Sequence, residues 1–158
     1  MIFLCTGTQK FPFDRLLKET DRLVNEGVIR DTVIAQTGTS AYQPSHLQAQ
    51  PFFSHDEMQK YTEEADLIIT HGGSGSIMNA LKLGRKVIAV PRLARFGEHV
   101  DDHQTQLVRA LADAGYLCAC MNIEELGRLI SDIPQMTFRT YKSDPERISD
   151  DISAYLSL

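Results

Sequence analysis

Glycine and serine residues are concentrated at one point of the chain, between an apolar run and a helical pattern. The segment HGGSGS (residues 71–76) separates the strand-like ADLIIT (65–70) from IMNALKLG (77–84). Glycines leave backbone N–H groups uncovered, and a helix that begins directly afterwards adds the positive end of its dipole. The serine hydroxyls can add further donors. This combination predicts a phosphate-binding loop.

The spacing of the glycines limits which class of phosphate-containing ligand this loop binds. The order Gly72, Gly73, Gly75 does not fit the G-x-G-x-x-G pattern of dinucleotide-binding oxidoreductases, and no Gly-Lys-Ser/Thr follows as in a P-loop NTPase. A simpler alternative is a flexible turn in which Ser74 caps the following helix.

A second polar cluster lies in PRLARFGEHVDDHQTQLVRAL (91–111), after another apolar run. Its polar residues are Glu98, His99, Asp101, Asp102, His103 and Gln104. Carboxylates accept and amides both donate and accept hydrogen bonds, so such a cluster can bind hydroxyl groups. Arg92 and Arg95 could balance an anionic ligand. The alternatives are helix capping for the two aspartates and a solvated surface position for the arginines. A phosphate loop beside a hydroxyl-binding loop suggests a nucleotide-sugar.

Alternating strands and helices would position both loops. Strands are expected at 1–5, 31–36, 49–53, 65–70, 86–90 and 116–120, and helices at 14–26, 55–64, 74–83, 101–114 and 123–130. This alternation predicts a single Rossmann-like, doubly wound α/β domain with a parallel sheet, over residues 1–142. Residues 143–158 are expected to form an amphipathic helix with Ile148, Ile152, Tyr155 and Leu156 on one face, packed on its own sheet or bridging to a partner.

Composition excludes several classes of protein. The chain has 158 residues and a formal charge of −5, which argues against nonspecific nucleic-acid binding. Its apolar runs are too short to span a bilayer, and the first residues predict a strand with no signal peptide before it. Cys5, Cys118 and Cys120 lie in apolar stretches and are expected to be buried, reduced thiols of a cytoplasmic protein. No Cys/His pair has convincing metal-site spacing, so no metal is expected.

The quoted segments resemble the donor-binding, C-terminal half of GT-B glycosyltransferases of the MurG/Alg13-like group (glycosyltransferase family 28). The likeness is strongest over residues 50–117, and LCTGTQKFPFDRLLKE (4–19) resembles the first strand, loop and helix of that domain. The runs HGGSGSIMNALK and GEHVDDHQ are similar to those of short bacterial exopolysaccharide subunits of the PssE type.

This resemblance implies a role for each matching residue. Gly7 and Thr8 would face the diphosphate, which Gly73, Ser74, Gly75 and Ser76 would hold. Phe53 and Ser54 would present their backbone to the uracil, Asn79 would bind the ribose, and Asp102, His103 and Gln104 would contact the sugar. Many two-domain relatives have Glu where Asn79 stands. His71 and His103 are weak candidates for a catalytic base, which is more often supplied by the other domain. The alternative is that these histidines orient loops or contact the donor, and His71 is expected among the substrate-binding residues.

The resemblance also implies a function and a partner. We expect the donor-binding, catalytic subunit of a two-component, inverting hexosyltransferase that uses a UDP-sugar without metal or other cofactor. A membrane-anchored Alg14/PssD-like subunit would bind the lipid-linked acceptor of polysaccharide biosynthesis and hold this heteromer at the inner face of the plasma membrane. The alternative is a non-catalytic enhancer that only stabilises a membrane-bound glycosyltransferase.

Overall fold

A computed structural model describes residues 1–142, and its centre is a six-stranded sheet in the order β3-β2-β1-β4-β5-β6. The strands are β1 (Ile2–Cys5), β2 (Val33–Gln36), β3 (Gln48–Gln50), β4 (Leu67–His71), β5 (Lys86–Val90) and β6 (Cys118–Ala119). Every neighbouring pair is parallel. Parallel strands need a crossover connection, which is usually a helix.

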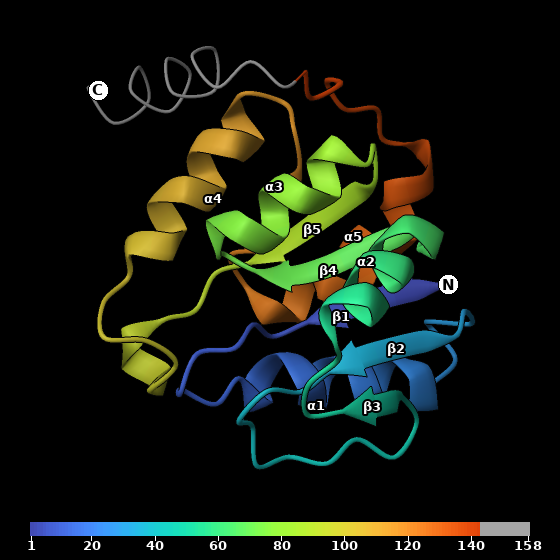
Figure 1. Ribbon diagram of the computed structural model, residues 1–158, viewed down its shortest axis with the longest axis vertical. Coiled ribbons are helices and arrows are strands. Elements are labelled where there is room, and N and C mark those ends of the chain that lie inside the picture. The colour runs from blue at the N-terminus through green and yellow to red at the C-terminus, as the bar shows by residue number, and fades with distance from the viewer. Residues whose placement is uncertain (143–158) are drawn as a thin grey trace.

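The described residues form five α-helices, which are α1 (Asp14–Asn25), α2 (His55–Glu64), α3 (Ser74–Lys82), α4 (His103–Asp113) and α5 (Leu126–Asp132), with short 3-10 turns at Ala94–Phe96, Ile123–Glu125 and Ile133–Gln135. Four of these helices, α1 to α4, lie between successive strands and provide such crossovers, whereas β2 and β3 are joined without an α-helix and α5 follows β6 (Figure 1). Helices α1 and α5 cover one face of the sheet, and α2, α3 and α4 cover the other. Within residues 1–142, no helix combines the length and the apolar character that crossing a membrane requires.

Side chains of the central strands alternate between two apolar cores. In β1, Ile2 and Leu4 pack with α1 and α5, whereas Phe3 packs with the helices of the opposite face. The neighbouring β4 does the same, since Ile69 joins the first core and Ile68 the second. A strand covered on both faces is apolar throughout, which explains the unbroken runs in the sequence.

The strand order places a topological switch point between β1 and β4. The chain leaves β1 toward α1 on one face, whereas it leaves the adjacent β4 toward α3 on the other. The two connecting loops therefore separate at the carboxyl edge of the sheet, and this is where ligands bind in open α/β sheets.

The predicted fold is confirmed, with corrections at element ends. Helix α4 begins at His103 and not at residue 101, and β3 ends at Gln50 because Pro51 has no N–H for the ladder. The expected strand at 116–120 is only two residues long. All three cysteines are free and buried, as expected. The amphipathic helix expected at 143–158 lies outside the described residues.

Candidate functional site

A cavity of about 610 Å³ lies at the switch point, between the loops that follow β1 and β4 and the start of α4. It is lined by Cys5, Gly7, Thr8, Gln9, Gln36, Met58, His71, Gly72, Gly73, Ser74, Gly75, Ser76, His99, His103, Gln104 and Leu107. This volume lies within the usual range for small-molecule sites. The lining contains neither lysine nor arginine, so an anion bound there would depend on backbone amides and neutral donors.

Most of the residues singled out from the sequence meet at this cavity. Its lining includes Gly7, Thr8, His71, Gly73, Ser74, Gly75, Ser76, His103 and Gln104. Phe53, Ser54, Asn79 and Asp102 are not part of the lining. Five further lining residues were not predicted as site residues from the sequence: Cys5, Gln9, Gln36, Met58 and Leu107. Gln36 is the last residue of β2, and that position was the available signal, because the carboxyl ends of parallel strands share one edge.

The N-terminus of α3 opens onto the cavity without a cap from the protein. Its N-cap is Gly73, which has no side chain, and neither serine caps the helix, contrary to the alternative for Ser74. Among the described residues, no acceptor binds the amides of Ser74, Gly75 and Ser76. These are orphan donors of a helix start, and they lie where the helix dipole is positive. The site can therefore bind an anion.

Helix α2, which begins after β3, shows the opposite arrangement. Ser54 accepts a hydrogen bond from the amide of Glu57 (3.1 Å), and the Glu57 carboxylate accepts one from the amide of Ser54 (2.8 Å). This capping box makes Ser54 the cap of the helix and satisfies two of the amides at its start. The start of α3 thus differs from that of α2 in leaving its amides open toward the cavity.

Two glycines of the site make room for a histidine ring. A Cβ on Gly73 would lie 2.1 Å from Cε1 of His71, and one on Gly7 would lie 2.6 Å from Nε2 of the same ring. Gly7 also has a φ of +82°. A Cβ on Gly75, by contrast, would meet nothing within 4 Å. Only Gly75 leaves its space free for a ligand, whereas Gly7 and Gly73 serve the packing of His71 between the two loops.

His71 is held as a neutral hydrogen-bond donor. Its Nδ1 accepts from the amide of Gly73 (3.1 Å) and lies 3.4 Å from Nε2 of Gln104. Burial, with the charges of Arg92 and His99, lowers the pKa of His71 to about 4. A neutral ring that accepts at Nδ1 carries its proton on Nε2. At neutral pH this Nε2–H can donate to a ligand, and such a ring is a weak base.

The low pKa of His71 predicts that the stability of the fold depends on pH. The unfolded chain binds a proton at His71 below about pH 6.5, whereas the folded chain does so only near pH 4, so stability present above pH 6.5 is lost as the pH falls. We expect a loss of about 2 kcal/mol between pH 7 and pH 5. In His71→Asn, the asparagine amide oxygen can replace Nδ1 as the acceptor. The free energy of unfolding in urea should therefore fall by correspondingly less between pH 7 and pH 5 in this variant. Equal losses in the two proteins would contradict the prediction.

Gln104 connects the loop after β4 to the loop after β5 at the base of the cavity. Its side-chain oxygen accepts from the amide of Gly72 (3.1 Å) and from the amide of Arg92 (3.0 Å), and the residue is 3 % exposed. A Cβ on Gly72 would lie 2.6 Å from Cβ of Gln104. The glycine at 72 therefore permits a close approach of α4, and Gln104 fixes the loop that leads into α3.

Arg92 is buried and does not serve as a surface cation or line the cavity. Its guanidinium donates to the carbonyls of Thr6, Phe11 and Glu98. These hydrogen bonds join the loop after β1 to the loop after β5. The expectation of a direct counter-charge is therefore corrected for Arg92. Arg95 is exposed over the Phe96 ring and is likewise outside the lining.

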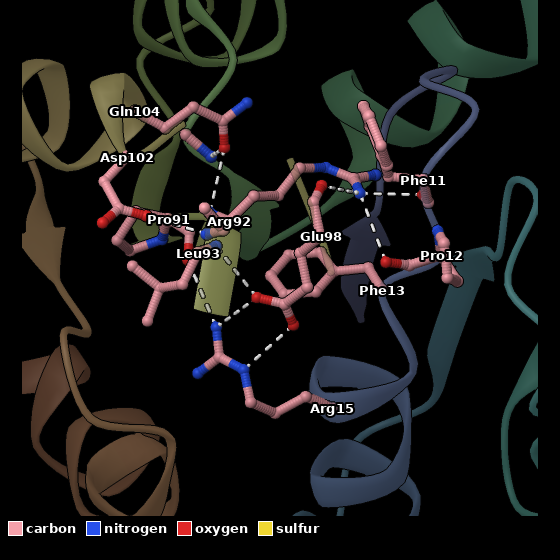
Figure 2. Close-up of polar contacts among 12 residues, drawn as sticks. Phe11, Pro12, Phe13, Arg15, Pro91, Arg92, Leu93, Glu98, Asp102 and Gln104 are labelled. Carbon is pink, nitrogen blue, oxygen red and sulfur yellow. Dashed lines mark hydrogen bonds and ion pairs between the residues drawn. The ribbon is translucent and has the colours of Figure 1, made fainter. Parts of the chain in front are cut away.

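The acidic residues of the second cluster have separate partners. Glu98 is buried and forms a bidentate pair with Arg15, at 2.9 and 3.0 Å, while it also accepts from the amide of Leu93 (Figure 2). Asp102 accepts from the amide of Ala94 at 2.8 Å and does not cap α4 with its side chain. These bonds shape the loop before α4 and delay the start of that helix to His103.

Asp101 lies between two histidines. Its Oδ1 accepts from the amide of His103 (3.1 Å), contacts Nδ1 of the same residue and lies 3.6 Å from Nδ1 of His99. The hydrogen bond with the His103 side chain lowers the pKa of Asp101. The two imidazoles are edge to face, with centroids 4.6 Å apart. The sequence placed these three residues in a predicted hydroxyl-binding cluster, and the spacing of its Cys and His residues predicted no metal.

The residues expected to contact the base and the ribose border the cavity on the α2 side. The amide of Phe53 donates to Oε1 of Gln36 (3.0 Å), and the Phe53 ring packs edge-on against Tyr61 with centroids 5.0 Å apart. Asn79 is half-buried and donates to Gln59 of α2 at 3.5 Å. The amides of Phe53 and Ser54 are thus occupied by Gln36 and Glu57.

Comparisons with known proteins identify a matching family. The family model of the glycosyltransferase family 28 C-terminal domain matches residues 1–153. A UDP-N-acetylglucosamine transferase subunit ALG13 from Candida albicans is 27% identical over 95 residues, which cover 60% of this chain and 31% of that protein. A UDP-N-acetylglucosamine–N-acetylmuramyl-(pentapeptide) pyrophosphoryl-undecaprenol N-acetylglucosamine transferase from Syntrophus aciditrophicus is 28% identical, over 88% of this chain and 36% of that protein.

Solved structures share the fold. MurG from Acinetobacter baumannii superposes with a TM-score of 0.64 at 20% identity, over 100% of this chain and 50% of MurG. An NMR structure of ALG13 gives a TM-score of 0.60 at 19% identity, over 94% of this chain and 92% of that one. The chain spans about a third of the length of the first curated relatives, with shares of 31%, 36% and 34%.

Proposed function

Because the chain belongs to the glycosyltransferase family 28 C-terminal domain family, we propose that it binds the UDP-sugar donor of a glycosyltransferase. The observation that carries this proposal is the uncapped start of α3 at the switch-point cavity, where three amides have no acceptor among the described residues. A diphosphate is the ligand that such a helix start favours. The relatives named above are described as UDP-N-acetylglucosamine transferases, which supports uridine as the nucleoside.

The proposed reaction is an in-line displacement at the anomeric carbon of the UDP-sugar, with inversion of configuration. The bond from this carbon to the diphosphate oxygen breaks as the acceptor oxygen bonds to the carbon, and the electron pair leaves with UDP. The amides of residues 74–76 and the dipole of α3 would stabilise the charge that develops on the diphosphate. The Nε2–H of His71 would add a neutral donor. We propose that these donors together replace a metal ion at the diphosphate.

The acceptor half of the enzyme would come from another subunit. The ALG13 relative is described as a subunit of a UDP-N-acetylglucosamine transferase, which supports a separate subunit for the acceptor. We propose that an Alg14/PssD-like, membrane-anchored partner binds a lipid-linked acceptor and supplies the base that deprotonates its hydroxyl. The product would be a hexosylated lipid intermediate of an exopolysaccharide, made in the cytoplasm at the inner face of the plasma membrane.

Calorimetric titration tests the donor site. The purified chain is titrated with UDP, UMP and a panel of UDP-hexoses, first with EDTA and then with Mg²⁺. We expect UDP to bind at least about tenfold more tightly than UMP, because only the diphosphate reaches all the α3 amides, and about equally with and without Mg²⁺. CDP is the control for base recognition.

Two results would contradict the proposal. An absence of uridine nucleotide binding would remove the donor-binding role and favour the non-catalytic enhancer instead. A strict requirement for Mg²⁺ would remove the metal-free mechanism while leaving the donor-binding role in place.

A further inference from the structure

We propose that His99, Asp101 and His103 form a binding site for a late transition-metal ion of the Zn²⁺ type at the wall of the cavity. One ligand atom from each residue contributes, and these three atoms all lie within 4.8 Å of one another. Two of the residues, His99 and His103, line the cavity. This site is separate from the proposed diphosphate site at α3, and its occupation does not depend on a bound nucleotide.

The geometry is close to that of a three-ligand site. Metal–ligand bonds of about 2.0–2.1 Å place tetrahedral ligand atoms roughly 3.4 Å apart. Nδ1 of His99 lies 3.6 Å from Oδ1 of Asp101, which is nearly this separation. Nδ1 of His103 is in direct contact with the same Oδ1, so an ion would take the place of the hydrogen bond between them. The side chains of His103 and Asp101 are more than half exposed, so they can rotate to admit the ion.

The donor set selects the kind of ion. Two imidazole nitrogens and one carboxylate oxygen suit Zn²⁺, Co²⁺ or Ni²⁺, whereas Mg²⁺ prefers oxygen ligands. Three protein ligands leave further positions for water or a ligand, as in catalytic zinc sites. All three cysteines are buried, and none belongs to this cluster.

The surroundings hold the ligands without blocking them. His99 is mostly buried, with a side-chain exposure of 9%, and its ring lies against Phe11 with centroids 5.8 Å apart. Asp101 and His103 have side-chain exposures of 60% and 58% and so remain accessible to an ion from solvent. The α4 dipole disfavours a cation at His103, but the carboxylates of Asp101 and Asp102 precede that helix start and offset it.

Zinc and cobalt titrations of the full chain without a polyhistidine tag test the proposal, after EDTA treatment and in the absence of nucleotide. We expect one Zn²⁺ per chain, and visible absorption bands of Co²⁺ typical of a nitrogen and oxygen ligand set. Asp101→Asn and His99→Gln should each weaken Zn²⁺ binding by at least about tenfold, because each removes a ligand. His55→Gln is the matched control, since His55 is an exposed histidine outside the cluster and should leave Zn²⁺ binding unchanged.

The outcomes separate this proposal from the donor-binding proposal. Zn²⁺ binding that is absent, or equal in Asp101→Asn and the wild type, would overturn the metal site. UDP binding in EDTA would not change if the metal site were absent, so the donor-binding proposal would stand. Conversely, a chain that binds Zn²⁺ through these residues but no uridine nucleotide would retain the metal site and lose the proposed donor function. Circular dichroism of each variant verifies that the chain is folded.

Discussion

Replacing Ser74 with proline is expected to weaken UDP binding by about ten- to a hundredfold, because a hydrogen bond to a charged group contributes roughly 1.5–3 kcal/mol. Ser74 is the first residue of α3, and its amide is one of the three without an acceptor among the described residues. Proline removes this N–H and leaves the rest of the helix backbone in place. Calorimetric titration with UDP in EDTA measures the effect.

The structure at this position accommodates proline. The first helical position tolerates proline because its N–H has no partner within the helix. The preceding Gly73 has φ −76° and ψ 130°, which is the extended conformation that a residue before proline adopts. Ser74 is also exposed, so the ring has space. We therefore expect the melting temperature of Ser74→Pro to match that of the wild type.

Ser74→Ala is the matched control, because it removes the hydroxyl and retains the amide. The difference between Ser74→Pro and Ser74→Ala isolates the contribution of the backbone. We expect Ser74→Ala to weaken UDP binding only a few-fold, about the effect of one ordinary hydrogen bond. If both variants bound UDP equally, the Ser74 amide would have no part in diphosphate binding. The uncapped start of α3 would then no longer support the proposed function.

The features that the sequence could predict depend on local patterns. The strand before HGGSGS, the helix after it and the meeting of the loops at one edge follow from apolar runs, glycine positions and strand–helix alternation. Ser54 was recognisable as a cap because its partner, Glu57, is three residues away. These interactions are short in sequence, so their partners are visible in the sequence itself.

The features that the sequence could not predict involve partners far apart in the chain. Arg92 resembles a surface cation by type, but its acceptors include the carbonyls of Thr6 and Phe11, about eighty residues earlier. Gly73 resembles a ligand-binding glycine, but the ring of His71 occupies the space of its missing side chain. Tertiary packing determines both roles, and a reading of residue types alone leaves them open.

Gln104 gives the second large expected effect, and it concerns what this residue does for the donor. Resemblance implies a contact with the sugar, whereas the structure uses its side-chain oxygen to hold the amides of Gly72 and Arg92. Gln104→Met has a similar shape but no acceptor, so it leaves two buried donors unsatisfied at about 1–3 kcal/mol each. We expect the free energy of unfolding in urea to fall by roughly 2 kcal/mol or more.

The same variant should weaken UDP and UDP-hexose binding by the same factor, at least about tenfold. The reason is that Gln104 fixes the loop that leads into α3, so its loss displaces the diphosphate donors whether or not a sugar is present. Gln106→Met, on the exposed side of the same helix, is the matched control and should leave both affinities unchanged. A loss confined to UDP-hexoses, with UDP binding unaltered, would assign Gln104 to the sugar and refute its role as the residue that positions the loop.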